Sequence, residues 1–296
     1  MTILTMNPEV VCEKVSELGE GPLWDPSRKL ICWVDILNGH IHEWSPVSKT
    51  LNTLQVGQMI GAMAICNDGN YIAAIKEGFG FVNPKTGEVE MIENPEGHLP
   101  GNRFNDGKCD PAGRFWAGTM PLSEDKPSGS LYMIASDRSA VKREGAITIS
   151  NGLAWSLDHK VLYYIDTPTL EVVGYDFDME NGNITNKRTI INIPKEEGFP
   201  DGMTIDNEGM LWIAHWGGWQ VTRWNPSTGK KLSAIKLPVS NVTSCIFGGE
   251  SMKDLYITSA RKGLSVAELE KQPLAGSLFV IKESGFTGVE AYKFKN

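Results

Sequence analysis

Four oxygen-bearing side chains occur at related positions along this chain, each just before a glycine. They are Glu20 in "GEGPLWD", Asn105 in "FNDGKCD", Asn151 in "SNGLAWSLD" and Asp201 in "PDGMTID". Three of them lie five positions before an aspartate typical of a turn, and Asn151 lies seven positions before its own. One Asp or Asn before Gly is an ordinary turn residue. Four at matching positions indicate a shared site.

The chemistry that these four side chains could perform together is the binding of a divalent cation. Two carboxylates and two amide carbonyls offer the oxygen ligands that hard ions prefer. Without an ion, two buried carboxylates would repel each other and one would take up a proton. One divalent ion is therefore predicted, with Ca²⁺, Mg²⁺, Mn²⁺ and Zn²⁺ all open as its identity. Zinc held by His and Cys is disfavoured, because the sequence shows no His/Cys cluster with ligand spacing.

A repeated pattern supplies the elements that would bring these side chains together. An apolar strand, a turn built on aspartate and a strand with an aromatic residue recur about every 40–50 residues. The copies are "WDPSRKLICWVD", "CNDGNYIAAI", "CDPAGRFWAGT", "LDHKVLYYID", "IDNEGMLWIA" and "MKDLYITSA". A second pair of strands around a turn such as "NPKTG" or "NPSTG" follows in most copies. Each copy therefore predicts four antiparallel strands.

Six such units predict an all-β fold, a six-bladed β-propeller with four-stranded antiparallel blades around a central channel. No linker divides the chain, so a single domain over residues 1–296 is expected. The segment "EVVCEKVSELGE" before the first unit is expected to pair with the last blade and close the ring. Residues 263–276 could form a short helix. Five tryptophans beside the turns are expected to pack between blades: Trp24, Trp33, Trp116, Trp155 and Trp212.

Composition limits the classes of partner. The net charge of −8 and the absence of Lys/Arg runs disfavour nucleic acid and anionic membranes. No apolar run is long enough for a membrane span, and no signal peptide is evident. Five scattered cysteines are expected to be reduced thiols in a cytoplasmic protein. Serine-hydrolase, zinc-protease and nucleotide-binding motifs are absent from the sequence.

Five stretches resemble the gluconolactonase/regucalcin family and its bacterial sugar lactonases. They are "LGEGPLWD", "NRFNDGKCDPAGRFWAGTM", "SNGLAWSLDHKVLYYID", "FPDGMTIDNEGMLWIA" and "SCIFGG". The resemblance implies that Glu20, Asn151 and Asp201 are metal ligands. It also implies that Arg103 and Asn105 contact substrate.

One further position departs from the family's pattern. A glutamate that touches substrate in animal members is replaced in "GTMPLSED" by Ser123, which leaves the preferred substrate open. Asn102, beside Arg103 and Asn105, adds to a polar set that suits a polyhydroxylated molecule. Aromatic residues in "AHWGGW" could form a wall of the pocket, although packing at the rim is an equal reading.

The function predicted from this resemblance is metal-dependent hydrolysis of a small sugar lactone. Asp201 is the expected general base, with Glu20 as the alternative if Asp201 acts only as a ligand. Two other functions stay open at this point: a related propeller that hydrolyses phosphotriesters or aryl esters, and a calcium-binding regulator without catalysis. The sequence leaves the preferred lactone and the oligomeric state undetermined.

Overall fold

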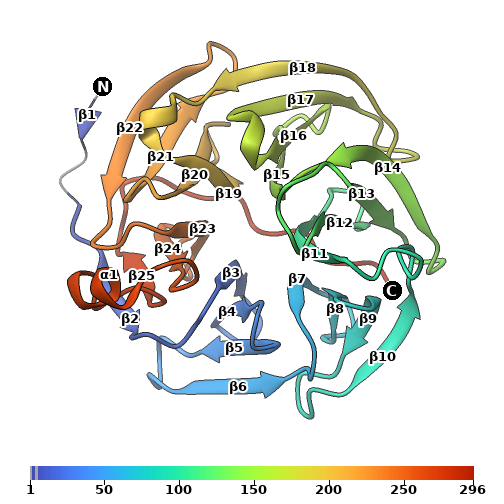
Figure 1. The fold of residues 1–296 in the computed structure, drawn as a ribbon, viewed down its shortest axis with the longest axis horizontal. Coiled ribbons are helices and arrows are strands. Elements are labelled where there is room, and N and C mark those ends of the chain that lie inside the picture. Colours follow the sequence, from blue (N-terminus) through green and yellow to red (C-terminus); the bar gives the residue numbers. More distant parts are fainter. Residues whose placement is uncertain (1, 4–5) are drawn as a thin grey trace.

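The fold is a closed ring of six β-sheets. A computed structural model describes residues 2–3 and 6–296, and Figure 1 shows the sheets arranged around a central axis. The six sheets follow one another in chain order. Among residues 19–248, strands that are neighbours in a sheet run antiparallel. The predicted six-bladed β-propeller is confirmed. No helix among the described residues has the length and apolar character needed to cross a bilayer.

The first three blades each contain four consecutive strands, which follow one another from the axis outward. Blade 1 contains β3 (Gly19–Asp25), β4 (Leu30–Asp35), β5 (His40–Trp44) and β6 (Leu51–Gln55). Blade 2 contains β7 (Ile60–Ile65), β8 (Tyr71–Ile75), β9 (Gly78–Val82) and β10 (Val89–Glu93). Blade 3 contains β11 (Asn102–Cys109), β12 (Phe115–Pro121), β13 (Gly129–Ile134) and β14 (Ala140–Ile147).

The other three blades continue this order. Blade 4 contains β15 (Ser150–Trp155), β16 (Val161–Asp166), β17 (Glu171–Phe177) and β18 (Ile184–Asn192). Blade 5 contains β19 (Phe199–Ile205), β20 (Leu211–Trp216), β21 (Gln220–Asn225) and β22 (Lys230–Lys236). Blade 6 contains β23 (Val242–Gly248), β24 (Asp254–Ser259) and β25 (Leu278–Ile281). Two 3₁₀ turns, η1 (Thr167–Thr169) and η2 (Lys195–Glu197), follow β16 and precede β19.

The N-terminal segment completes the last blade. β2 (Glu9–Cys12) pairs antiparallel with β25 and becomes the outer strand of blade 6, as expected from the sequence. β1 (Thr2–Ile3) adds a parallel strand to β22. The expected helix is α1 (Val266–Lys271), which begins with a capping box between Ser265 and Glu268.

Buried turn aspartates make the same contacts in blades 3 and 5. Asp110 and Asp206 are completely buried, and one carboxylate oxygen of each accepts backbone N–H groups within its own turn. The second oxygen accepts the indole N–H of the tryptophan six residues later, Trp116 or Trp212, at 2.9 Å in both blades. The aspartate thereby fixes the turn and fastens the next strand to it. The five tryptophans named above are buried, as predicted.

The innermost strands share an irregularity that positions the candidate ligands. Pairing shifts between Glu20 and Leu23 in β3, and between Asn151 and Leu153 in β15. The same shift spans Asn105 in β11 and Asp201 in β19. Such a bulge interrupts the alternation of side chains and re-aims one of them. The polar residues therefore lie where each inner strand departs from regular pairing.

The C-terminal segment after β25 crosses the ring on its way to the chain end, as the red trace in Figure 1 shows. Its backbone bonds successively to blades 6, 5, 2 and 3, through Met252, Asn207, Ile65 and Gly113. Phe294 is buried against the core of blades 2 and 3. This C-terminal strap, residues 282–296, therefore connects non-adjacent blades.

Candidate metal and active site

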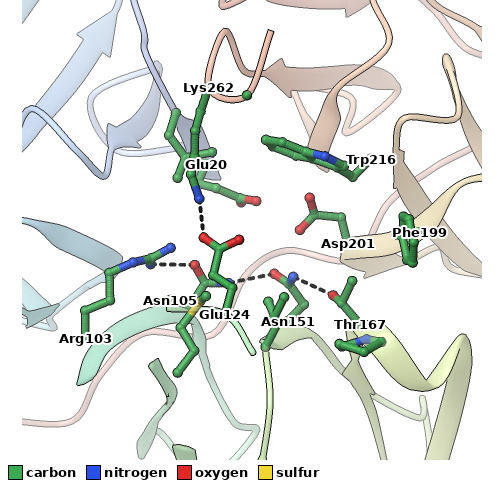
Figure 2. Close-up of a pocket in the computed structure, with 15 residues that line it drawn as sticks. Glu20, Arg103, Asn105, Glu124, Asn151, Thr167, Phe199, Asp201, Trp216 and Lys262 are labelled. Atoms are coloured by element: carbon green, nitrogen blue, oxygen red, sulfur yellow. Dashed lines mark hydrogen bonds and ion pairs between the residues drawn. The ribbon is translucent and has the colours of Figure 1, made fainter. Parts of the chain in front are cut away.

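A cavity of about 390 Å³ opens at one end of the channel. Its walls come from the starts of inner strands and from the loops beside them (Figure 2). Glu20, Asn105, Asn151 and Asp201, which belong to four different blades, all line it. The four side chains that occupy related positions in the sequence therefore meet in one cavity.

The two carboxyl groups, Glu20 and Asp201, face each other across the cavity (Figure 2). Each carboxyl group lies close enough to influence the pKa of the other. Burial, with help from the nearby Asp106 carboxylate, raises the pKa of Glu20 to about 8. Burial and the Glu20 charge raise the pKa of Asp201 well above its ordinary range. A bound cation would supply the positive charge that this pair of carboxylates lacks.

A chain of hydrogen bonds sets the orientation of the amide side chains. The Arg103 guanidinium donates to Asn105 Oδ1 at 2.7 Å, and Asn105 Nδ2 donates to Asn151 Oδ1 at 3.1 Å. Asn151 Nδ2 then donates to Thr167 Oγ1 at 2.8 Å, and Thr167 donates to the carbonyl of Pro200, next to Asp201. The amide nitrogen of Asn151 is therefore directed away, and its oxygen keeps one lone pair for another ligand.

These donors fit a hard divalent cation. Two buried carboxylates and one oriented amide oxygen form an oxygen-only set with excess negative charge. Arg103 reduces that excess from one side, and burial lowers the pKa of its guanidinium only to about 10, so it stays charged at neutral pH. Glu20, Asn151 and Asp201 are the residues that could hold the ion.

Asn102 and Ser123 do not line this cavity. The Asn102 amide donates to buried Glu96 and to the Ser128 carbonyl, at 3.0 Å each, and it lines a separate cavity with Lys76. Ser123 is exposed and donates to Asp125. The turn after β12 directs its neighbour Glu124 into the cavity instead. The structure thus places both residues outside this cavity, because loop direction and a local amide bond decide where each side chain points.

Several residues of the cavity were not singled out from the sequence. Lys262 extends from the loop after β24 and forms an ion pair with Glu124 (Figure 2). Thr167 and Phe199 complete the wall near Asp201. Single lysine, threonine and phenylalanine residues at the ends of elements or between them carry no pattern that a sequence could reveal.

The aromatic residues at the end of β20 and just after it occupy three environments. Trp216, the last residue of β20, lines the cavity, as the wall interpretation suggested. His215 is fully buried, and its Nε2 lies 2.5 Å from Thr222 Oγ1. Trp219 is 41% exposed and lies outside the cavity lining.

One group of possible metal ligands that contains two histidines lies outside the cavity, where the ligand spacing in the sequence gave no indication of it. Candidate ligand atoms of Asp35, His40 and His42 lie within 4.8 Å of one another at the top of β4 and β5. The cluster arises because a hairpin joins the two strands, and the spacing along the chain conceals it. The alternation His40-x-His42 on one strand face was the available signal.

The chain matches a known protein family over most of its length. Residues 18–261 match the family model described as the SMP-30/gluconolactonase/LRE-like region. Regucalcin of Danio rerio is 39% identical over 288 residues, which cover 97% of each chain.

Two solved structures share the whole fold. A calcium-binding protein, regucalcin, from Agrobacterium tumefaciens superposes with a TM-score of 0.95 at 28% identity, and each chain is fully covered. A luciferin-regenerating enzyme superposes with a TM-score of 0.91 at 31% identity, covering 98% of this chain and 100% of that one.

Proposed function

Because the chain belongs to the SMP-30/gluconolactonase/LRE-like family, we propose that it is a divalent-metal-dependent hydrolase of sugar lactones. The observation that carries this proposal is the convergence of Glu20, Asn151 and Asp201 in one cavity beside Arg103. A buried, oxygen-only ligand set next to a charged hydrogen-bond donor suits the opening of an uncharged, polyhydroxylated ester ring.

Glu20, Asn151 and Asp201 would hold the cation, and hydrogen bonds fix the positions of the first two. A bound divalent ion would supply Lewis acidity toward the lactone carbonyl oxygen. The hydrogen bond from Asn105 holds the oxygen of Asn151 in place, and Thr167 fixes its nitrogen. Gly21 N–H donates to Glu20 Oε2 at 2.8 Å and keeps that carboxylate at the start of β3.

Asp201 is the proposed general base. Its carboxylate removes a proton from water as the water oxygen attacks the lactone carbonyl carbon. When the ring C–O bond breaks, the protonated Asp201 returns that proton to the leaving ring oxygen. One water is consumed, and the product is the open hydroxy acid. Thr167, which bonds to the Pro200 carbonyl at 2.8 Å, holds the backbone next to Asp201.

The remaining cavity residues would recognise the sugar. Arg103 donates to the Phe104 carbonyl and to Asn105, which leaves further guanidinium N–H groups for substrate oxygens. Glu124 offers acceptors for hydroxyl groups, and Trp216 presents an apolar surface to the ring. This mixture favours a hydroxylated ring over an apolar ester.

A matched activity panel tests the proposal. Chelated protein and protein reloaded with Ca²⁺, Mg²⁺, Mn²⁺ or Zn²⁺ are assayed on aldonolactones, a phosphotriester and an aryl ester. We expect metal-restored hydrolysis of at least one aldonolactone and a loss of at least about 100-fold in Asp201→Asn. The exposed variant Asp137→Asn, with the same chemical change far from the cavity, serves as the control.

Two results would contradict the proposal. Undiminished lactone hydrolysis after complete chelation would exclude a metal-dependent reaction, and near-normal turnover by folded Asp201→Asn would remove that residue from the chemistry. Tight Ca²⁺ binding without turnover on any substrate would instead favour a calcium-binding role, which the similarity to the calcium-binding regucalcin of Agrobacterium makes the second candidate.

A further inference from the structure

A second group of possible metal ligands lies in blade 1, outside the central cavity. Asp35 ends β4, and His40 and His42 belong to β5. Asp35 pairs with His40 across the two strands, and Trp33 pairs with His42. Because side chains two apart on a strand share a face, this register places Asp35, His40 and His42 on one face of the blade. Their candidate ligand atoms lie within 4.8 Å of one another.

Among the described residues, His42 has one hydrogen-bonded and one unpartnered ring nitrogen. The residue is only 3% exposed, and its Nδ1 lies 2.9 Å from Thr53 Oγ1 on β6. Its Nε2 is buried and has no hydrogen-bond partner among the described residues. Burial lowers the pKa of His42 to about 4, so the ring is neutral at physiological pH. With a proton on Nδ1 donated to Thr53, Nε2 carries a free lone pair, which is the state a metal ligand requires.

Asp35 is held in a fixed orientation by its own hydrogen bonds. Its Oδ2 accepts the backbone N–H of Glu17 at 2.9 Å and the side-chain amide of Asn38 at 2.8 Å. Its Oδ1 accepts only the backbone N–H of Leu18, at 3.1 Å, and so keeps a lone pair. The carboxylate is therefore anchored and still able to accept one more partner.

His40 gives this cluster access to solvent. Its side chain is half-buried, whereas Asp35 and His42 are buried. Two ligands of one tetrahedral zinc ion lie roughly 3.3 Å apart when metal–ligand bonds are about 2.0 Å. Ligand atoms as far apart as 4.8 Å would therefore have to approach by about 1.5 Å to bind one ion. The half-buried His40 is the least enclosed of the three side chains.

We propose that Asp35, His40 and His42 form a second metal site that takes a borderline transition ion of the zinc class, separate from the oxygen-only centre. Two imidazoles and one carboxylate are ligands that Zn²⁺ accepts, with solvent available for a fourth position. The two sites would then differ in metal preference: the oxygen-only central site would favour hard ions, and the blade 1 site would favour ions that bind imidazole nitrogen.

A buried histidine elsewhere shows what distinguishes this cluster. His215 in blade 5 also bonds to a threonine through one ring nitrogen, and its other nitrogen is buried without a partner. Among the described residues, however, no further His, Cys, Asp or Glu joins it in a group that could hold an ion. The inference therefore depends on the convergence of three ligands and not on a single unpaired nitrogen.

Zinc binding to untagged, full-length protein tests the proposal. The central site is first disabled by Glu20→Gln with Asp201→Asn, and ZnCl₂ is titrated against a chromophoric chelator. We expect one zinc ion to bind in this background. His40→Ala should weaken binding by more than about 100-fold, and Thr53→Val, which removes only the bond to His42 Nδ1, by about 10–100-fold. His98→Ala, at an exposed histidine in another blade, should leave zinc affinity unchanged.

The position of the ion provides an independent readout. Anomalous diffraction at the zinc edge should place the peak between Asp35 and His42. Absence of zinc binding in the background variant, or binding that His40→Ala does not alter, would overturn the proposal. Because His40 lies outside the central cavity, His40→Ala should keep full lactone hydrolysis. A failure of the zinc site is therefore distinguishable from a failure of the proposed enzymatic function.

Discussion

At the scale of single residues, the site is defined by carboxylates placed where water cannot stabilise their charge. Glu20 and Asp201 are both nearly completely buried, and the half-buried Lys108 donates to the Met203 carbonyl at 2.8 Å and not to either of them. Burial of like charges costs folding free energy unless a cation or a proton compensates. The two buried carboxylates therefore lower the stability of the metal-free protein and give the cavity a strong preference for positive charge.

The first prediction concerns the pH dependence of stability in the metal-free protein. The folded-state pKa of Glu20, about 8, lies above its unfolded value, so the native state holds more protons over this range. This contribution to stability is complete below about pH 4.3 and is lost as the pH rises through about 8. Denaturant unfolding in EDTA should show the free energy of unfolding falling between pH 5 and pH 8 by more than about 1.4 kcal/mol.

A matched variant isolates that effect. Asp201→Asn removes one of the two buried charges, so its metal-free form should be more stable than wild type at pH 8 and lose less stability between pH 5 and pH 8. Equal pH profiles for the two proteins would show that the central carboxylates do not control stability. Metal binding should also strengthen with pH over the same interval, because bound carboxylates must be deprotonated.

The second prediction concerns the ion pair at the cavity mouth. Lys262 and Glu124 are each about one-third exposed, so their attraction contributes less than about 1 kcal/mol to stability. Lys262→Met should therefore change the unfolding midpoint little, while it raises KM severalfold because Glu124 loses the partner that orients it. Lys29→Met breaks an exposed ion pair in another region, with Glu250, and should change neither quantity. An unaltered KM in Lys262→Met would exclude a positioning role for this residue.

At the scale of elements, the inner strands place the site by packing backbone against backbone. A Cβ added at Gly152 would lie 2.8 Å from the Asp201 carbonyl oxygen and 2.9 Å from Met203 Cβ. β15 and β19 therefore approach each other at a distance that only glycine allows. The candidate base in blade 5 is thus located by a glycine in blade 4.

The third prediction uses that close approach. Gly152→Ala should shift β19 by a few tenths of an ångström, lower kcat about 10-fold or more and cost roughly 1–3 kcal/mol of stability. Gly101→Ala is the matched control, because a Cβ at Gly101 would meet open space and its backbone does not require glycine. Its stability should stay within about 0.5 kcal/mol of wild type. Full activity in Gly152→Ala would show that β19 tolerates displacement.

The same scale explains what the sequence could and could not predict. Turn aspartates and strand alternation are local patterns, so the six units and their four strands were predictable. The convergence of the four candidate residues was also predictable, because each of them lies at a bulge one or two positions before a glycine. The direction of the turn after β12 was not, since Ser123 and Glu124 are adjacent and only the fold decides which one enters the cavity. The approach of His40 and His42 to Asp35 depends on hairpin register, which the spacing did not reveal.

At the scale of the whole molecule, the ring is held together by its ends. β2 joins blade 6 before the chain enters blade 1, and the C-terminal strap bonds to blades on both sides of the ring. Separation of neighbouring blades would therefore have to break contacts at both termini. The strap is the larger of these links, because Phe294 is buried in the core shared by blades 2 and 3.

The fourth prediction tests the contribution of the strap to stability. Phe294→Ala should lower the free energy of unfolding by about 3–5 kcal/mol, as expected for removal of a buried aromatic side chain. Val266→Ala, which truncates an exposed side chain on α1, should change it by less than about 0.5 kcal/mol. Thermal or denaturant unfolding measures both. A small effect of Phe294→Ala would mean that the strap is dispensable for ring closure.

The path of the strap also decides how molecules reach and leave the centre. Residues 289–292 lie against the inner strands at the far end of the channel, and the cavities there measure only about 30 and 40 Å³. A sugar cannot pass through spaces of that size. In the part of the chain that the structure describes, the lactone and the acid of the proposed reaction would therefore share the opening of the central cavity. The acid should then compete with its own precursor for that opening.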